Sequence, residues 1–117
     1  MNWKNEDEYA VASQSELITY VHNGTMIKGK KCLLGDHKPC SVNFVFKAAI
    51  MITGGVNGEI VTWNGLNGSN PGKTYKSTHT SGIWAIEKAF GKTAETAFYT
   101  GGNEGKVVLW NAQFQPT

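Results

Sequence analysis

A stretch of twelve residues occurs twice in this chain, and this repetition constrains the fold more than any other feature. Residues 52–63 read ITGGVNGEIVTW, and residues 99–110 read YTGGNEGKVVLW. Trp110 follows Trp63 by 47 residues, so the two copies align without a gap. A weaker third copy, VASQSELITY at residues 11–20, matches when two residues are deleted at its turn, which aligns Tyr20 with Trp63. The chain therefore consists of similar units that follow one another.

Each copy predicts a β-hairpin. Residues 59–63 alternate in the period-2 pattern of a half-buried strand, and the turns at 56–58 and 103–105 contain residues that tolerate a positive φ. Further β-like runs precede the hairpins at 41–46 and 82–86, and another follows the first hairpin at 73–77. Sustained helical periodicity is absent from the sequence, which predicts an all-β fold.

The predicted strands fall into three units, at about residues 9–34, 41–77 and 83–117. They contain three, four and three strands, and those of the first unit are expected at 9–12, 17–21 and 31–34. A period in the forties is typical of the four-stranded blade of a β-propeller. Propellers close with about four to eight blades, so the chain is expected to supply about two and a half blades of an incomplete propeller. It is either a segment of a larger propeller, which we favour, or a unit that assembles with copies of itself.

Composition narrows the class of protein. A length of 117 residues and a 40% hydrophobic content are typical of one globular domain with a core. A net charge of +2 does not indicate a nucleic-acid partner, and apolar runs approaching the ~20 residues of a membrane span are absent. The N-terminal residues are polar and acidic, unlike a secretory signal, so a cytoplasmic location is expected. Cys32 and Cys40 are expected to be free thiols in a reducing compartment.

The repeated residues resemble the WD-repeat β-propeller family. The resemblance rests on His37, Thr53-Gly54, Asn57-Gly58 and Trp63-Asn64, and on His79, Thr100-Gly101, Glu104-Gly105 and Trp110-Asn111. In that family a His before the first strand, a Ser or Thr on the second, an acid in the next turn and a Trp on the third form a hydrogen-bonded network. The resemblance implies four-stranded antiparallel blades and two such networks: His37, Thr53, Asn57 and Trp63; and His79, Thr100, Glu104 and Trp110.

The sequence departs from the family pattern at several positions. The turn acid is replaced by Asn57 in one repeat, and the terminal Asp of the signature is Asn64 or Asn111. The first repeat keeps Ser13 but has Tyr20 in place of Trp and lacks the upstream His, so a network is not expected there.

The residues argue against catalysis. Neither a carboxylate pair nor a His cluster accompanies His37 and His79, so both are expected to be structural, and catalytic residues, metals and cofactors are not expected. The Gly-rich segment 54–58 lacks the Gly-Lys-Ser/Thr ending of a phosphate loop. A propeller enzyme remains an alternative. It would require convergent acids or histidines at the starts of the inner strands, where the sequence has Val42, Asn43, Ile83 and Trp84.

The expected function is a non-catalytic scaffold for protein–protein interactions. The fold alone does not identify the partner. The Thr-Gly-Gly, the Trp-Asn ending and the 47-residue repeat are similar to echinoderm microtubule-associated protein-like propellers, which bind tubulin and microtubules. This resemblance implies a cytoskeletal location. For a scaffold of either kind, the loop 64–72 and the strand Lys73–Lys76 are expected near a binding rim. A self-assembling half-propeller is the other alternative.

Overall fold

The chain folds into three antiparallel β-sheets. The computed structural model describes residues 2–3, 8–13, 16–23, 26–32, 34–46, 50–63, 71–76, 79, 81–89, 91, 95–102 and 104–116. The first sheet contains β1 (Asn2–Trp3), β2 (Glu8–Ala12), β3 (Leu17–Asn23) and β4 (Met26–Lys31) in that order. The second contains β5 (Pro39–Val45), β6 (Ile50–Gly55), β7 (Glu59–Trp63) and β8 (Pro71–Lys76), and the third contains β9 (Ile83–Lys88), β10 (Ala97–Gly102) and β11 (Val107–Asn111).

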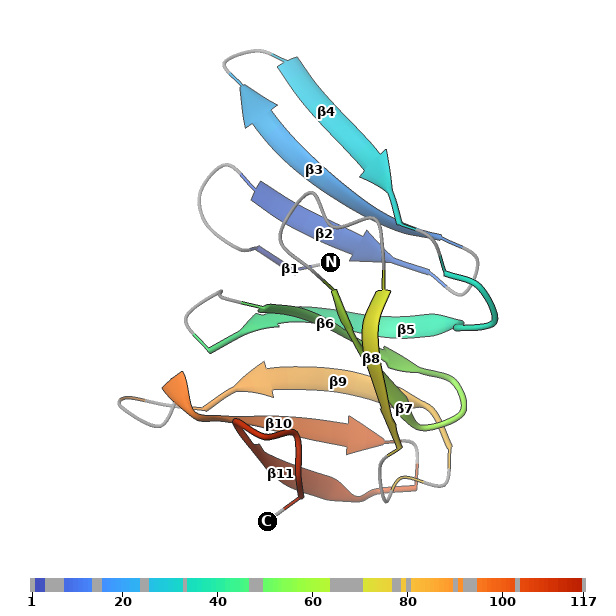
Figure 1. The fold of residues 1–117 in the computed structure, drawn as a ribbon, viewed down its shortest axis with the longest axis vertical. Helices are drawn as coiled ribbons and strands as arrows, with labels where there is room; N and C mark the ends of the chain where they lie inside the picture. The colour runs from blue at the N-terminus through green and yellow to red at the C-terminus, as the bar shows by residue number, and fades with distance from the viewer. Residues whose placement is uncertain are drawn as a thin grey trace.

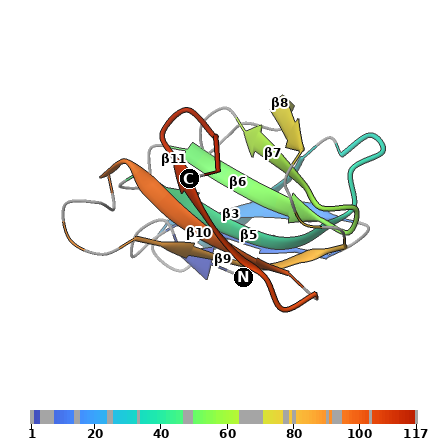
Figure 2. The same ribbon diagram turned by 90° about the horizontal axis from the view of Figure 1, so that it is seen from below.

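The sheets lie face to face in chain order, with the second between the other two (Figure 1). Seen along the stack, the third sheet lies over the second (Figure 2). The first strands of the sheets are neighbours, because β5 contacts both β1 and β9. The described residues contain no helix long and apolar enough to cross a membrane.

The first sheet differs from the sequence-based expectation. It has four strands rather than three, because the short strand β1 pairs with β2. Its last strand is β4 at Met26–Lys31, and the expected strand at 31–34 is wrong. The apolar residues after β4 suggested that strand, but Cys32 and Leu34 pack against the interface with the second sheet. The other expected strands are present within a few residues of their predicted positions.

Apolar side chains fill both spaces between sheets. Between the first and second sheets the buried cluster contains Ala10, Leu17, Cys32, Val42, Phe44, Met51, Val61 and Trp63. Between the second and third it contains Val45, Ile52, Ile60, Ile83, Ile86, Phe98, Val108 and Trp110. Each face of the second sheet therefore contributes to a different core, as the alternation of side chains along a strand requires.

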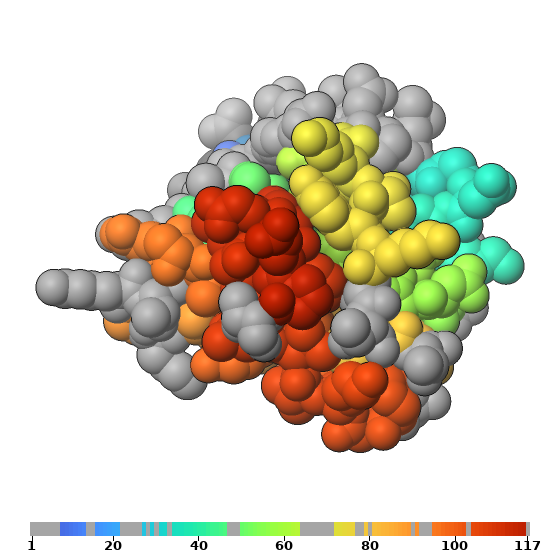
Figure 3. Space-filling view, turned by 60° about the horizontal axis from the view of Figure 1, so that its bottom comes forward, coloured from blue at the N-terminus to red at the C-terminus, as the bar shows by residue number. Residues whose placement is uncertain are grey.

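An aromatic cluster closes one end of the interface between the second and third sheets. Phe46 and Phe114 contact each other edge to face, with ring centroids 5.7 Å apart, and Phe114 stacks on Tyr75 of β8 at 4.8 Å. Figure 3 shows the C-terminal residues lying against β8. Trp110 bridges to Pro116 as Trp63 pairs with Pro71, so the chain after β11 begins to turn back as it does after β7.

Candidate functional site

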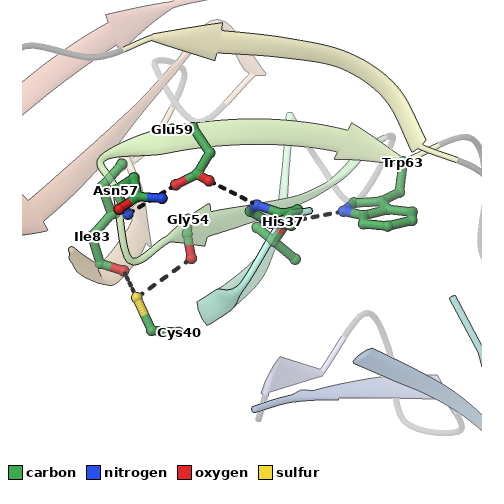
Figure 4. A network of polar contacts seen from close by, with 8 residues as sticks. His37, Cys40, Gly54, Asn57, Glu59, Trp63 and Ile83 are labelled. Atoms are coloured by element: carbon green, nitrogen blue, oxygen red, sulfur yellow. Dashed lines mark hydrogen bonds and ion pairs between the residues drawn. The ribbon is translucent and has the colours of Figure 1, made fainter. Parts of the chain in front are cut away.

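A buried polar network ties the second sheet together. Trp63 Nε1 donates to Thr53 Oγ1 at 3.0 Å, and His37 Nε2 lies 2.7 Å from the same oxygen (Figure 4). Because the indole can only donate, Thr53 accepts its hydrogen bond and can offer its own hydroxyl hydrogen to His37 Nε2. This assignment places the imidazole hydrogen on Nδ1, which faces Glu59 Oε2 at 3.4 Å.

The third sheet carries the same arrangement. Trp110 Nε1 donates to Thr100 Oγ1 at 2.9 Å, and His79 Nε2 lies 2.7 Å from that oxygen. His79 Nδ1 hydrogen-bonds directly to Glu104 Oε1, and Ser81 Oγ donates to Glu104 Oε2 at 2.9 Å. The structure thus brings together all four residues that the sequence placed in this network.

The acid of the second network comes from a different position. The structure places Glu59, the first residue of β7, beside His37. Asn57 contributes its backbone N–H, which donates to Glu59 Oε1 at 3.1 Å (Figure 4). Sequence reasoning assigned Asn57 by its alignment with Glu104 and missed Glu59. The sequence does contain an indication of this role, because Glu59 is the acidic residue closest to this turn.

The network is replaced by apolar and aromatic packing in the first sheet. By strand register, Val11 opposite Ile18 corresponds to Thr53 opposite Val61, so Val11 occupies the hydroxyl position. Ser13 lies instead at the turn, where it hydrogen-bonds to Glu16. Tyr20 stacks on Tyr9 with centroids 5.0 Å apart. Of the two signature Asn residues, Asn111 Oδ1 accepts from the backbone of Gln113 and Gln115, and Asn64 lies outside the described residues.

The second glycine of each Thr-Gly-Gly leaves room for the network's carboxylate. A Cβ on Gly55 would collide with the carboxylate of Glu59. A Cβ on Gly102 would collide with the carboxylate of Glu104 and would lie 2.6 Å from His79 Nδ1. The motif therefore belongs to the network rather than to a phosphate site.

Burial and the acids set the charges of the two networks. Burial lowers the pKa of His37 below its ordinary value, although Glu59 opposes this shift, so the neutral imidazole is favoured. The hydrogen bond from His79 is the main cause that lowers the pKa of Glu104 to about 2. Glu104 is therefore ionised at neutral pH and can hold the N–H of His79 in place.

Side chains of β5 hydrogen-bond across to the third sheet. Ser41 Oγ donates to the carbonyl of Ile83, and Asn43 Nδ2 donates to the carbonyl of Ile86, both at 2.6 Å. Cys40 Sγ also lies 3.0 Å from the Ile83 carbonyl, and burial raises the pKa of its thiol. Neither Cys40 nor Cys32 forms a disulfide bond. At the starts of the inner strands, Val42, Asn43 and Ile83 are thus buried in packing, whereas Trp84 is exposed.

A groove made of two adjoining hollows, lined by both polar and apolar side chains, lies along the second sheet beside the networks. One hollow of about 350 Å³ is lined by Leu34, Asp36, His37, Asn57, Glu59, Val61 and Thr74. A second shares Asn57, Glu59 and Thr74 with it and extends to Lys76 and His79. Groups of three or more His, Cys, Asp or Glu that could hold a metal ion are absent from the described part of the chain.

Solved structures with the same fold are WD40 β-propellers. The chain superimposes on a chain from the "Crystal Structure of Mitotic Checkpoint Complex" with a TM-score of 0.73 and 12% identity, covering 98% of this chain and 34% of that one. It matches the C-terminal WD40 domain of Sif2 with a TM-score of 0.69 and 17% identity, covering 98% and 34%. The WD40 β-propeller domain of Doa1 matches with a TM-score of 0.51 and 14% identity, covering 95% and 50%.

The fold is therefore that of consecutive WD40 propeller blades, which together make an incomplete propeller. The chain spans about a third of the length of the first two structures that it matches. A search against family models found no match.

Proposed function

We propose that this chain is a non-catalytic scaffold for protein–protein interactions. The proposal rests on the location of the polar side chains in the structure. The histidines, threonines and tryptophans of the two networks are buried and bonded to one another, so they hold strands together. The groove beside them is open and presents charges of both signs from Asp36, Glu59 and Lys76. Such a surface suits a protein partner, and a chain in the crystal structure of the mitotic checkpoint complex has a similar fold.

The finer proposal is that the partner is the microtubule, with a cytoplasmic and cytoskeletal location. It is supported by the resemblance of the repeats to echinoderm microtubule-associated protein-like propellers. It is also supported by Lys73 and Lys76, which are exposed on β8 at the outer edge of the second sheet. An acidic tubulin surface would attract this edge through electrostatic interactions that salt screens.

Co-sedimentation of the purified chain with microtubules tests this proposal. We expect the chain to pellet at low ionic strength and to be released as salt rises. The double variant Lys73→Glu/Lys76→Glu should pellet less than Lys88→Glu/Lys106→Glu, which reverses the same number of exposed charges on the third sheet. Failure of the wild-type chain to pellet at low salt would contradict the microtubule proposal. The general scaffold proposal would then be tested by a screen for other protein partners.

A further inference from the structure

Both outer faces of the three-sheet stack expose apolar side chains. On the first sheet Val11 is 36% exposed and Ile27 is 56% exposed. On the third sheet Tyr99 is 37% exposed and Val107 is 71% exposed. Cross-strand pairing places all four on the faces turned away from the second sheet. Among the described residues, Trp84 is the one other large apolar side chain with comparable exposure.

The two interfaces inside the stack show what such faces contact. One sheet contributes aromatic rings from its second and third strands, as the third sheet does with Phe98 and Trp110. The preceding sheet contributes aliphatic side chains, as the second does with Ile52 and Ile60. At the interface between the first and second sheets, Met51 and Trp63 occupy the positions of Phe98 and Trp110, and Ala10 and Leu17 lie on the other side.

The open faces are the two halves of this same kind of interface. On the first sheet Tyr20 pairs with Tyr9 as Trp63 pairs with Met51, so the open face is the aromatic half. On the third sheet Tyr99 and Val107 follow Ile52 and Ile60 by 47 residues. They therefore occupy the positions whose side chains contact the aromatic rings of the next sheet, and we call this open face the receiving half of the interface.

Space for a close approach is present on the receiving half. A Cβ on Gly54 would lie 2.6 Å from Ile83 Cγ2, because Ile83 of the next sheet packs directly over that glycine. The equivalent glycine on the third sheet is Gly101, where the nearest atom to an added Cβ is Ala85 Cβ at 3.8 Å. The third sheet thus has the same small-residue site, which a side chain of a further sheet can enter.

We propose that a second copy of this chain binds head to tail, with the open face of its first sheet on the open face of the third sheet. Because each chain carries both halves of the interface, each is the complement of the next. The contact is heterologous, so successive copies either close into a ring or extend as a chain. This assembly does not depend on the proposed scaffold role or on microtubule binding.

Light scattering after size-exclusion chromatography, applied to mixtures of face-blocked variants, tests the proposal. The wild-type chain should form assemblies of several chains, either a ring of fixed mass or a linear assembly that grows with concentration. Val107→Glu blocks the receiving half and Val11→Glu blocks the aromatic half, so each variant alone should have the mass of one chain. An equimolar mixture should have the mass of two chains, because one intact half of each kind remains. Ile27→Glu, at a more exposed position on β4, is a second block of the aromatic half should Val11→Glu fail to fold.

Thr74→Glu is the matched control, since it adds the same charge to an exposed strand position on the second sheet, away from both faces. It should keep the wild-type mass, and circular dichroism should show the same β-sheet spectrum for all variants. A wild-type chain that stays monomeric at every concentration would overturn the proposal. So would self-association of Val107→Glu alone, which would indicate a symmetric contact, or a mixture that stays monomeric.

Discussion

At the scale of single residues, one threonine hydroxyl organises each network. Thr53 and Thr100 are completely buried, and each contacts a tryptophan nitrogen and a histidine nitrogen that belong to other segments. A hydroxyl can serve both because it accepts from the indole and donates to the imidazole. The histidines thereby fix the segments before β5 and β9 to the hairpins that follow.

Replacing either threonine by valine should destabilise the fold by about 1–3 kcal/mol, because a buried indole N–H and an imidazole nitrogen lose their partner. Urea unfolding of Thr53→Val and Thr100→Val measures this cost. Thr62→Val is a suitable control, since Thr62 lies on the same hairpin but its hydroxyl contacts the exposed backbone of Lys73. Losses no larger than that of the control would show that the networks contribute little.

The pKa shifts of His37 and Glu104 predict that acid destabilises the fold in two steps. The pKa of His37 is lowered, so below about pH 6.5 the unfolded chain takes up a proton that the folded chain resists, and stability falls. The pKa of Glu104 is lowered from 4.5 to about 2, so its contribution is complete above pH 4.5 and is lost as the pH falls toward 2.

Urea titrations across this pH range should show that Glu104→Gln flattens the lower step and leaves the upper step unchanged. Glu87→Gln removes an exposed carboxylate on β9 and should preserve both steps. An unchanged lower step in Glu104→Gln would show that this carboxylate is not held by His79.

At the scale of strands and hairpins, equivalent positions in the two repeats have different neighbours. Gly54 and Gly101 are both the first glycine of a Thr-Gly-Gly, 47 residues apart. Ile83 and Ser41 Oγ crowd Gly54, at 2.6 and 2.7 Å from an added Cβ, whereas Gly101 has room for one. The two glycines therefore differ in the space around them, and this difference follows from the packing of the third sheet on the second, not from the repeated sequence.

Gly54→Ala should destabilise the chain by about 1–3 kcal/mol, because the added methyl group overpacks the contact between the second and third sheets. Gly101→Ala is the matched control and should change the stability by less than about 1 kcal/mol. Thermal unfolding of both variants measures the difference. Equal losses would contradict the close approach of Ile83 to Gly54.

The hairpins could be predicted from the sequence because apolar alternation and turn glycines coincide in them. Gly58 and Gly105 have φ of +83° and +79°, which matches the turn chemistry. The two strands that were missed or misplaced lack these signals. β1 has two residues, and β4 is an edge strand rich in lysine and glycine with little apolar pattern. Glu59 was missed because repeat alignment cannot show that a carboxylate two residues further along reaches the same histidine.

At the scale of the whole molecule, the fold is a stack of sheets in which each sheet presents an aromatic side to the preceding sheet. The two cores depend on this order, and the outer faces repeat it without a neighbour among the described residues. The central claim is that each tryptophan hairpin is fixed internally by threonine and histidine within this stack.

Hydrogen exchange of the tryptophan indole N–H groups, measured by NMR, tests this claim most directly. Trp63 and Trp110 are at most 1% exposed and hydrogen-bonded, whereas Trp84 is 51% exposed. We predict slow exchange for Trp63 and Trp110, fast exchange for Trp84, and selective loss of the Trp63 protection in Thr53→Val. Indole N–H groups of Trp63 and Trp110 that exchange as fast as that of Trp84 would contradict the account.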